Sequence, residues 1–333
     1  MSFVRYNPED SVISSETVVR GLFTGDSYTL NSFSTSSNPS EYYVDVWNGD
    51  PTLSSSAVQF SLQYGNINGS GSALINSAVP NFTPSRVVYG EYRNLVFGTE
   101  TQNFSFDNGA TIANDIFVLN FARSRYKESL LQGSFNMTLK SGSRAIQLTD
   151  DSGTTNLTRF IGENEVYYII SGSNGNAYTA NASASYYGMM FPDLDIVILN
   201  ATASTVVDLR SYFAPINYAT SSQQNQLKLY NSIVSGSANS PSSSMTLQSS
   251  ETVSSRYFFT RVKNSEFNYT TNPSIIDANG NLLYTTLINN PQTFVTSVGM
   301  YNDNNELLAV AKLSQPLTKD FTKEALIRIK LDY

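Results

Sequence analysis

The sequence predicts a mainly β protein, built from two or three antiparallel β-sandwich or barrel-like domains with one short helix. The chain contains 21 Tyr and 19 Phe residues, and aromatic residues favour strands. Short apolar runs with period-two alternation recur between polar turns along most of the chain, a pattern typical of half-buried strands. A length of 333 residues exceeds that of an ordinary single domain, so we expect more than one.

The first predicted domain covers residues 1–107 and consists of short strands. The segment Glu41–Asp50 alternates valine with aromatic and acidic residues and reaches Asn48-Gly49, a pair that favours hairpin turns. The segment Ala57–Ala73 predicts another strand followed by a glycine-rich loop. A phosphate-binding loop would end in Gly-Lys-Ser/Thr and continue into an amphipathic helix. The sequence indicates neither, so we expect an ordinary loop.

The second predicted domain covers residues 108–244 and contains the expected helix, over residues 222–235. Apolar residues recur there at helical spacing, at Leu227, Tyr230, Ile233 and Val234. The serine-rich segment that follows, Ser235–Ser244, is typical of a flexible linker or long loop. This segment is the clearest predicted boundary between domains.

A short basic stretch in this domain carries Arg123, Arg125 and Lys127. On an extended chain the three side chains would share a face, and in a helical turn Arg123 and Lys127 would be neighbours. Both a solvated charged turn and a docking contact to an acidic neighbour fit the pattern. We therefore keep the three residues as interface candidates.

Two pairs of aspartates are the candidates for carboxylate chemistry: Asp150 with Asp151, and Asp193 with Asp195. Carboxylates adjacent in sequence rarely lie on opposite sides of a glycosidic bond. Pro192-Asp193 favours a turn before a buried strand, and no neighbouring residues complete a metal-ligand set. We expect both pairs to lie in turns.

The third predicted domain, residues 245–333, is rich in strands and includes a β-hairpin over Val298–Leu313. Its turn, Asn302–Asn305, is too short for a calcium loop and has no glycine, so we expect a metal-free hairpin. Four basic residues lie on predicted strands or at their ends: Arg261, Lys263, Arg328 and Lys330. They are candidates for contacts with acidic patches on a neighbour, or they solubilise exposed strands.

The amino-acid composition excludes several kinds of functional site. The chain contains no Cys and no His, which excludes disulfides, thiolate metal sites and a Ser-His-Asp triad. We therefore expect a protein that is not an enzyme and that binds no cofactor or metal. The net charge of −7 and the pI near 4.7 argue against a nucleic-acid partner.

The sequence shows no signal for secretion or membrane insertion. The N-terminus lacks the basic start and apolar core of a signal peptide, and no segment approaches the ~18 apolar residues of a membrane span. We expect synthesis in the cytoplasm and no membrane partner.

The C-terminal block resembles a module of tailed-phage proteins. A strand with Gly and Tyr, an acidic turn, a Leu-rich strand with Ala-Val, and a proline-to-lysine element occur in that order in collar-type tail-fibre attachment domains. Here they correspond to Val298–Asp303, Glu306–Leu313, and Pro316 with Lys319. In collar-type domains the module opens a fibre, whereas here it closes the chain. We therefore do not expect a long fibre.

A wider set of segments resembles virion structural proteins of contractile-tailed bacteriophages. The more specific ones are Arg256–Phe258, Val262–Tyr269 and Asn289–Gln292, and the looser ones are Asn120–Glu128 and Tyr187–Leu199. The first hundred residues carry no such likeness. The resemblance implies a non-enzymatic virion protein of the tail baseplate or fibre-attachment region. It would be present in several copies, with other tail or baseplate proteins and tail fibres as partners.

Other roles fit the same sequence. Within a virion, the chain would also suit a neck, collar or head-surface decoration protein. A carbohydrate-binding or receptor-binding β module would need an aromatic platform, and the one candidate cluster is Trp47 with Tyr42 and Tyr43.

Overall fold

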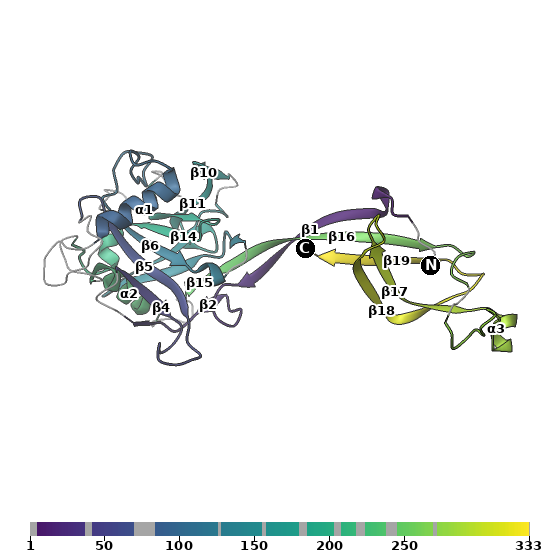
Figure 1. Ribbon diagram of the computed structural model, residues 1–333. Coiled ribbons are helices and arrows are strands. Elements are labelled where there is room, and N and C mark those ends of the chain that lie inside the picture. Colours follow the sequence, from purple (N-terminus) through teal and green to yellow (C-terminus); the bar gives the residue numbers. More distant parts are fainter. Residues whose placement is uncertain are drawn as a thin grey trace. The chain divides into compact units, whose positions relative to one another are not determined.

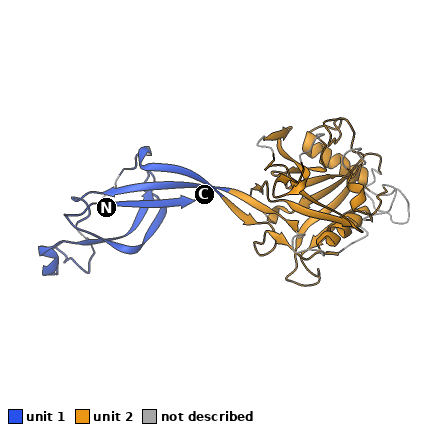
Figure 2. Ribbon diagram, turned by 180° about the vertical axis from the view of Figure 1, so that it is seen from behind, with its two compact units in different colours: residues 1–17, 252–333 blue, residues 18–251 orange. Residues whose placement is uncertain are grey.

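The chain folds into two compact units, which we describe separately. In the computed structural model, unit 1 comprises Met1–Thr17 and Thr252–Tyr333, and unit 2 comprises Val18–Glu251 (Figures 1 and 2). The boundary between the units falls within two strands, β1 (Ser11–Gly21) and β16 (Gln248–Val262). The structure describes residues 5–36, 42–69, 84–125, 128–154, 158–179, 185–202, 208–217, 224–237, 245–268 and 272–332.

The predicted mainly β fold is confirmed: among the described residues, 46% lie in strands and 15% in helices. The predicted helix over residues 222–235 is confirmed by α2, and the described residues contain two further helices. The helices are α1 (Ser85–Phe97), α2 (Gln224–Ser237) and α3 (Thr285–Asn289), and 3-10 turns cover Pro8–Asp10, Arg123–Arg125 and Leu209–Tyr212.

Unit 2 is built on a large curled antiparallel sheet of 13 strands. Its order is β2-β15-β8-β9-β11-β13-β14-β6-β5-β4-β3, with β10 and β12 paired to β11. The short strand β7 (Ser129–Leu130) pairs with β16 instead. The strands of the sheet are β2 (Thr29–Leu30), β3 (Ser34–Ser36), β4 (Tyr43–Trp47), β5 (Val58–Asn66), β6 (Asp115–Phe121), β8 (Asn136–Ser141), β9 (Arg144–Asp150), β10 (Arg159–Ile161), β11 (Asn164–Ser173), β12 (Asn176–Ala177), β13 (Gly188–Phe191), β14 (Ile196–Asn200) and β15 (Met245–Thr246).

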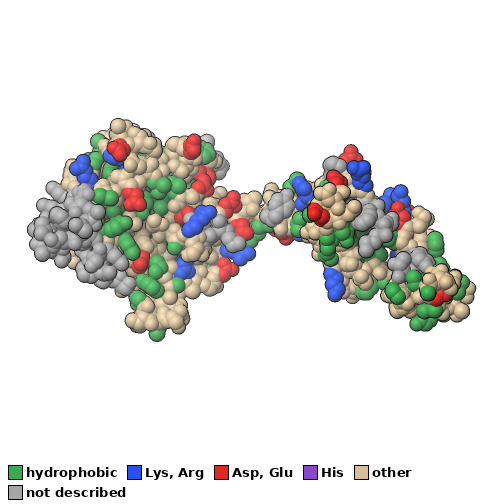
Figure 3. All heavy atoms as spheres, viewed as in Figure 1, with side chains coloured by type: hydrophobic (Ala, Val, Ile, Leu, Met, Phe, Trp, Pro, Cys, Tyr) green, Lys and Arg blue, Asp and Glu red, His purple; other side chains and the backbone are tan. Residues whose placement is uncertain are grey.

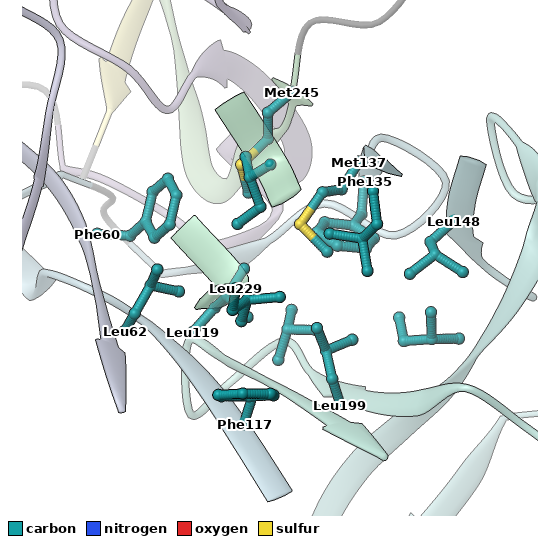
Figure 4. Packing of buried hydrophobic residues seen from close by; sticks show 14 of the residues in the cluster. Phe60, Leu62, Phe117, Leu119, Phe135, Met137, Leu148, Leu199, Leu229 and Met245 are labelled. Carbon is teal, nitrogen blue, oxygen red and sulfur yellow. The ribbon is translucent and has the colours of Figure 1, made fainter. Parts of the chain in front are cut away.

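Hydrophobic cores lie on both faces of this sheet. In β6, Phe117 and Leu119 belong to one buried cluster while Ile116 and Val118 belong to the other, because successive strand residues point to opposite faces. Helix α2 contributes Leu229 to the first cluster, part of which Figure 4 shows. Helix α1 covers the other face with Val88, Tyr89, Tyr92 and Val96. This double burial explains the continuous apolar runs of β6 and β14.

Helix α1 corrects the expectation that no amphipathic helix follows the glycine-rich loop. Its buried residues recur at helical spacing, and it ends at Gly98, whose φ of 65° is left-handed and whose N–H donates to the Asn94 carbonyl at 2.9 Å. The segment is rich in Val and Tyr, which favour strands. Packing against the sheet overrides that preference. Residues 70–83, which include part of the glycine-rich loop, lie outside the described residues.

The structure divides the chain differently from the predicted boundaries. Strands β5 and β6 lie on either side of residue 107, yet they pair over seven rungs from Phe60–Phe121 to Asn66–Asp115. Residues 1–107 and 108–244 therefore share one sheet. The boundary expected near residue 244 lies instead at Glu251, because β15 pairs with β2 and β8 within unit 2. The predicted linker falls largely outside the described residues.

Unit 1 contains most of a four-stranded sheet, ordered β1-β16-β19 with β7 also paired to β16, and a separate two-stranded sheet, β17-β18. Its remaining strands are β17 (Thr293–Tyr301), β18 (Leu307–Lys319) and β19 (Ala325–Asp332). Strands β16 and β19 pair antiparallel from Ser255–Asp332 to Val262–Ala325. The N-terminal residue Tyr6 contacts the ring of Phe258 on β16, with 5.6 Å between ring centroids.

Candidate interaction surface on unit 1

Unit 1 buries few of its apolar side chains. Of the 46 buried hydrophobic residues in the described part of the chain, only Phe258 and Val262 belong to unit 1. Of the 24 large hydrophobic residues that are exposed there, unit 1 contributes fifteen. Figure 3 shows apolar side chains on its surface. A concentration of exposed apolar groups over so small a core is typical of a surface that binds a partner.

The hairpin β17–β18 carries part of this apolar surface. Tyr301 pairs with Leu307, and the next rung on the same face pairs Gly299 with Val310. A Cβ atom at Gly299 would lie 2.9 Å from Cε2 of Tyr301 and 3.2 Å from Cδ1 of Leu307. Because Gly299 has no side chain, the Tyr301 and Leu307 side chains can occupy the space above it. Tyr301, Leu307 and Val310 are 41%, 53% and 60% exposed.

The predicted hairpin turn at Asn302–Asn305 is confirmed. The Asn302 N–H donates to the Glu306 carbonyl at 3.0 Å, and Asn302 Oδ1 accepts from the N–H groups of Asn304 and Glu306 at 3.0 and 2.8 Å. Asn305 adopts a φ of 62°, which asparagine tolerates. The asparagines of this turn therefore have structural roles.

The candidate basic residues of unit 1 largely share one face. The register pairs Arg261 with Leu326, Phe259 with Arg328, and Tyr257 with Lys330, so the three basic side chains point to the same side of the β16–β19 pair. Lys263 follows the end of β16 and is exposed.

Two of these charges are paired with carboxylates within the unit. Arg261 forms an ion pair with Glu324 at 2.6 Å, and Lys330 forms one with Asp332 at 3.1 Å. Hydrogen bonding to the two carboxylates raises the pKa values of Arg261 and Lys330. The Arg328 guanidinium lies over the Tyr257 ring, 5.4 Å from its centroid. The face therefore presents alternating charge and apolar area.

The basic stretch of unit 2 does not form one surface. Arg123 and Arg125 lie in a 3-10 turn and diverge. Arg123 Nη1 is 3.8 Å from Asp195 Oδ2, whereas Arg125 Nη1 donates to Thr24 Oγ1 at 2.9 Å. Lys127 lies outside the described residues.

Asp193 and Asp195 lie in the turn between β13 and β14, as predicted, but they do not share a face. Asp193 is exposed, whereas Asp195 is 4% exposed at a φ of 60°. Burial raises the pKa of Asp195 to about 7, an effect that Arg123 opposes. Its Oδ1 atom is buried without a hydrogen-bond partner. The two residues therefore do not form a carboxylate pair.

Asp150 is the last residue of β9 and so lies in a strand instead of the expected turn, which begins at Asp151. Both carboxylates accept hydrogen bonds from the backbone of neighbouring segments. Both oxygens of Asp150 accept the Gly133 N–H at 2.9 Å, and burial raises the pKa of Asp150. Asp151 accepts from the Tyr168 N–H at 2.9 Å and pairs with Arg159 at 2.6 Å. Both carboxylates therefore fix loops against the sheet.

The candidate aromatic cluster does not form a flat platform. Tyr42 and Tyr43 meet edge to face, with 5.7 Å between centroids and 86° between planes. Tyr43 and Trp47 lie on the same side of β4, four residues apart, opposite the buried Val44 and Val46. That spacing separates them by about 13 Å along the strand.

One functional candidate was missed by the sequence analysis: Lys319 is fully buried. Its ammonium group donates to the carbonyl oxygens of Asn264 and Asp320 at 3.0 and 2.7 Å and to Asn268 Oδ1 at 2.7 Å. It therefore joins the loop after β16 to the end of β18. The only sequence signal was its place in the proline-to-lysine element.

Comparisons with known proteins leave the family open. No family model matches the chain, and no curated protein or solved structure matches it. Among the described residues, no helix is both long and apolar enough to cross a membrane.

Proposed function

We propose that the chain is a non-enzymatic structural component of a phage tail, an adaptor of the baseplate or fibre-attachment region. In this role, unit 1 attaches the chain to neighbouring tail proteins. The observation that carries the proposal is the exposed apolar surface of unit 1, combined with its very small buried core. A surface of this kind is stabilised when a neighbour covers it.

The resemblance to virion proteins supports the same surface. Its more specific segments, Arg256–Phe258, Val262–Tyr269, Asn289–Gln292 and residues 298–319, all belong to unit 1. The part of the chain that resembles an attachment module is therefore the part with the exposed apolar side chains. Matched charges on the β16–β19 face would orient a neighbour more than they add affinity.

The roles of the candidate carboxylates favour structure over catalysis. Asp150 and Asp151 accept hydrogen bonds from the backbone of Gly133 and Tyr168, and in the other pair Asp195 is buried whereas Asp193 is exposed. Glycoside hydrolysis needs two carboxylates on opposite sides of the scissile bond.

Incorporation into particles tests the proposal. In the phage that encodes the chain, Leu308→Glu places a charge on an apolar residue that is 64% exposed on β18. We expect the full-length variant to fall about tenfold or more in purified particles, measured by quantitative mass spectrometry, because burying an unpaired charge at an interface is costly.

The matched control is Phe160→Glu, which makes a similar change at a residue 63% exposed in unit 2. It should leave incorporation unchanged. Absence of the unaltered chain from purified particles would overturn the proposal, and equal incorporation of both variants would move the attachment surface away from unit 1.

A further inference from the structure

Strand β17 has an unprotected edge. Among the described residues, β18 is the only strand that pairs with β17, so the other edge of β17 offers its backbone groups to a partner. The sequence Thr293–Tyr301 contains no charged residue and no proline. Its partner β18 carries Lys312 and Pro316. A lysine charge and a proline that lacks an N–H group both oppose the pairing of another strand at an edge.

Within its own unit the hairpin is held by the buried Lys319 at the end of β18 and by a partly buried face, with little apolar core. Neither β17 nor β18, both fully described, contributes a hydrophobic residue to the buried core. Phe294 and Tyr301, at the two ends of β17, are 60% and 41% exposed. A two-stranded sheet is marginally stable in water, and further strands stabilise it.

Charge favours a second copy of this chain as the partner. Unit 1 contains nine Lys and Arg against ten Asp and Glu, a net −1, which leaves −6 of the total −7 in unit 2. Copies can therefore approach through unit 1 with less repulsion than through unit 2. Because β17 is uncharged, pairing it with itself opposes no like charges.

We propose that the chain forms a homodimer in which β17 of one copy pairs antiparallel with β17 of another. Two-fold symmetry makes the contact isologous and yields a continuous sheet in the order β18-β17-β17-β18. This inference goes beyond the proposed function, because it holds whatever particle the chain belongs to.

The test is the molar mass of the purified full-length chain, measured by light scattering after size exclusion and by sedimentation over a range of concentrations. We expect a concentration-dependent species of twice the 36.6 kDa chain mass. Thr296 is exposed and adjacent to the midpoint of β17, so Thr296→Lys brings two lysines close together across the two-fold axis. We expect it to weaken dimerisation about tenfold or more.

Ser314→Lys is the matched control, since Ser314 is exposed on β18 and the substitution adds the same charge to the same hairpin. It should leave the dimer intact, and circular dichroism should show that both variants fold. As a second measurement, amide exchange in residues 293–301 should slow as the concentration of the unaltered chain rises.

A monomer at all concentrations would overturn the inference and point to a different protein as the partner strand. A dimer that both lysine variants weaken equally, or that neither weakens, would also overturn it. The measurement needs no phage particle, so its failure would leave the tail assignment standing, and failure of the incorporation experiment would leave the dimer standing.

Discussion

At the scale of single residues, Asp195 shows how burial changes the chemistry of a turn. Its carboxyl group is almost fully buried at a left-handed position, and the nearest basic group in an ion pair with it, Arg123, lies 3.8 Å away with a largely exposed side chain. Removal from water disfavours the charged form more than this distant partner favours it. The pKa of Asp195 is therefore raised to about 7.

This pKa predicts a pH-dependent stability. The folded state keeps the proton of Asp195 at pH values where the unfolded chain has lost it, so the free energy of unfolding falls as the pH rises from about 4 to about 7. Asp195→Asn removes the charge and suits the left-handed backbone. We expect it to raise the free energy of unfolding at pH 8 by on the order of 1 to 3 kcal/mol, with little effect near pH 4.

Denaturant unfolding at both pH values measures the difference. Asp193→Asn, at the exposed position of the same turn, is the control and should change stability little at either pH. A stabilisation by Asp195→Asn that is the same at pH 4 and pH 8 would show that the carboxylate charge is not its cause.

Lys319 makes a second prediction at this scale. Lys319→Met keeps an apolar stem but leaves three oxygen acceptors without the ammonium donor. We expect unit 1 to lose about 2 to 4 kcal/mol of local stability, because buried polar groups without partners are costly. Faster amide exchange in residues 263–268 would report the loss.

The control for Lys319 lies on the same turn. Lys323 pairs with Asp320 at 3.3 Å, but its side chain is 56% exposed. Lys323→Met should leave amide exchange in residues 263–268 unchanged. Equal exchange in both variants would mean that the buried ammonium group does not hold this loop.

At the scale of elements, two helical glycines show opposite packing environments. A Cβ atom at Gly236, near the end of α2, would lie 2.1 Å from the Thr138 carbonyl oxygen on β8. At Gly90, inside α1, a Cβ atom would meet no heavy atom within 4 Å. The first glycine permits a close helix-to-strand contact, whereas the second only lowers helix propensity.

Alanine substitutions should therefore change stability in opposite directions. Gly236→Ala forces α2 away from the sheet and should cost about 1 to 3 kcal/mol in the free energy of unfolding. Gly90→Ala should raise it by up to about 1 kcal/mol. Denaturant unfolding of the two variants checks the pair, and destabilisation by both would contradict the distinction drawn from the packing.

Elements that depend on contacts within a few residues could be predicted from the sequence. Helix α2 and the hairpin around Asn302–Asn305 follow from local spacing and turn chemistry. Helix α1 could not, because its Val and Tyr residues favour strands and only packing on the sheet makes them helical. The burial of Lys319 could not be predicted either, since two of its three acceptors come from a loop about fifty residues earlier.

At the scale of the whole molecule, the division into units could not be predicted because it depends on pairing between distant segments. Leu30 pairs with Met245, and β1 lies beside β16 although more than 200 residues separate them. The predicted interface residues are split accordingly: Arg261, Arg328 and Lys330 share a face of unit 1, whereas Arg123 and Arg125 diverge in unit 2. Only the full strand register shows which candidates act together.

We propose above that the chain is a tail component held through unit 1. The most direct test is a cryo-electron microscopy map of the phage particle proposed to contain the chain, at a resolution that traces this chain. We predict density for it in the tail, at the baseplate or fibre-attachment region, with exposed side chains of unit 1 such as Leu308 and Leu326 covered by neighbouring subunits. A map that places the chain on the neck or head, that leaves unit 1 in solvent, or that lacks the chain altogether would contradict the claim.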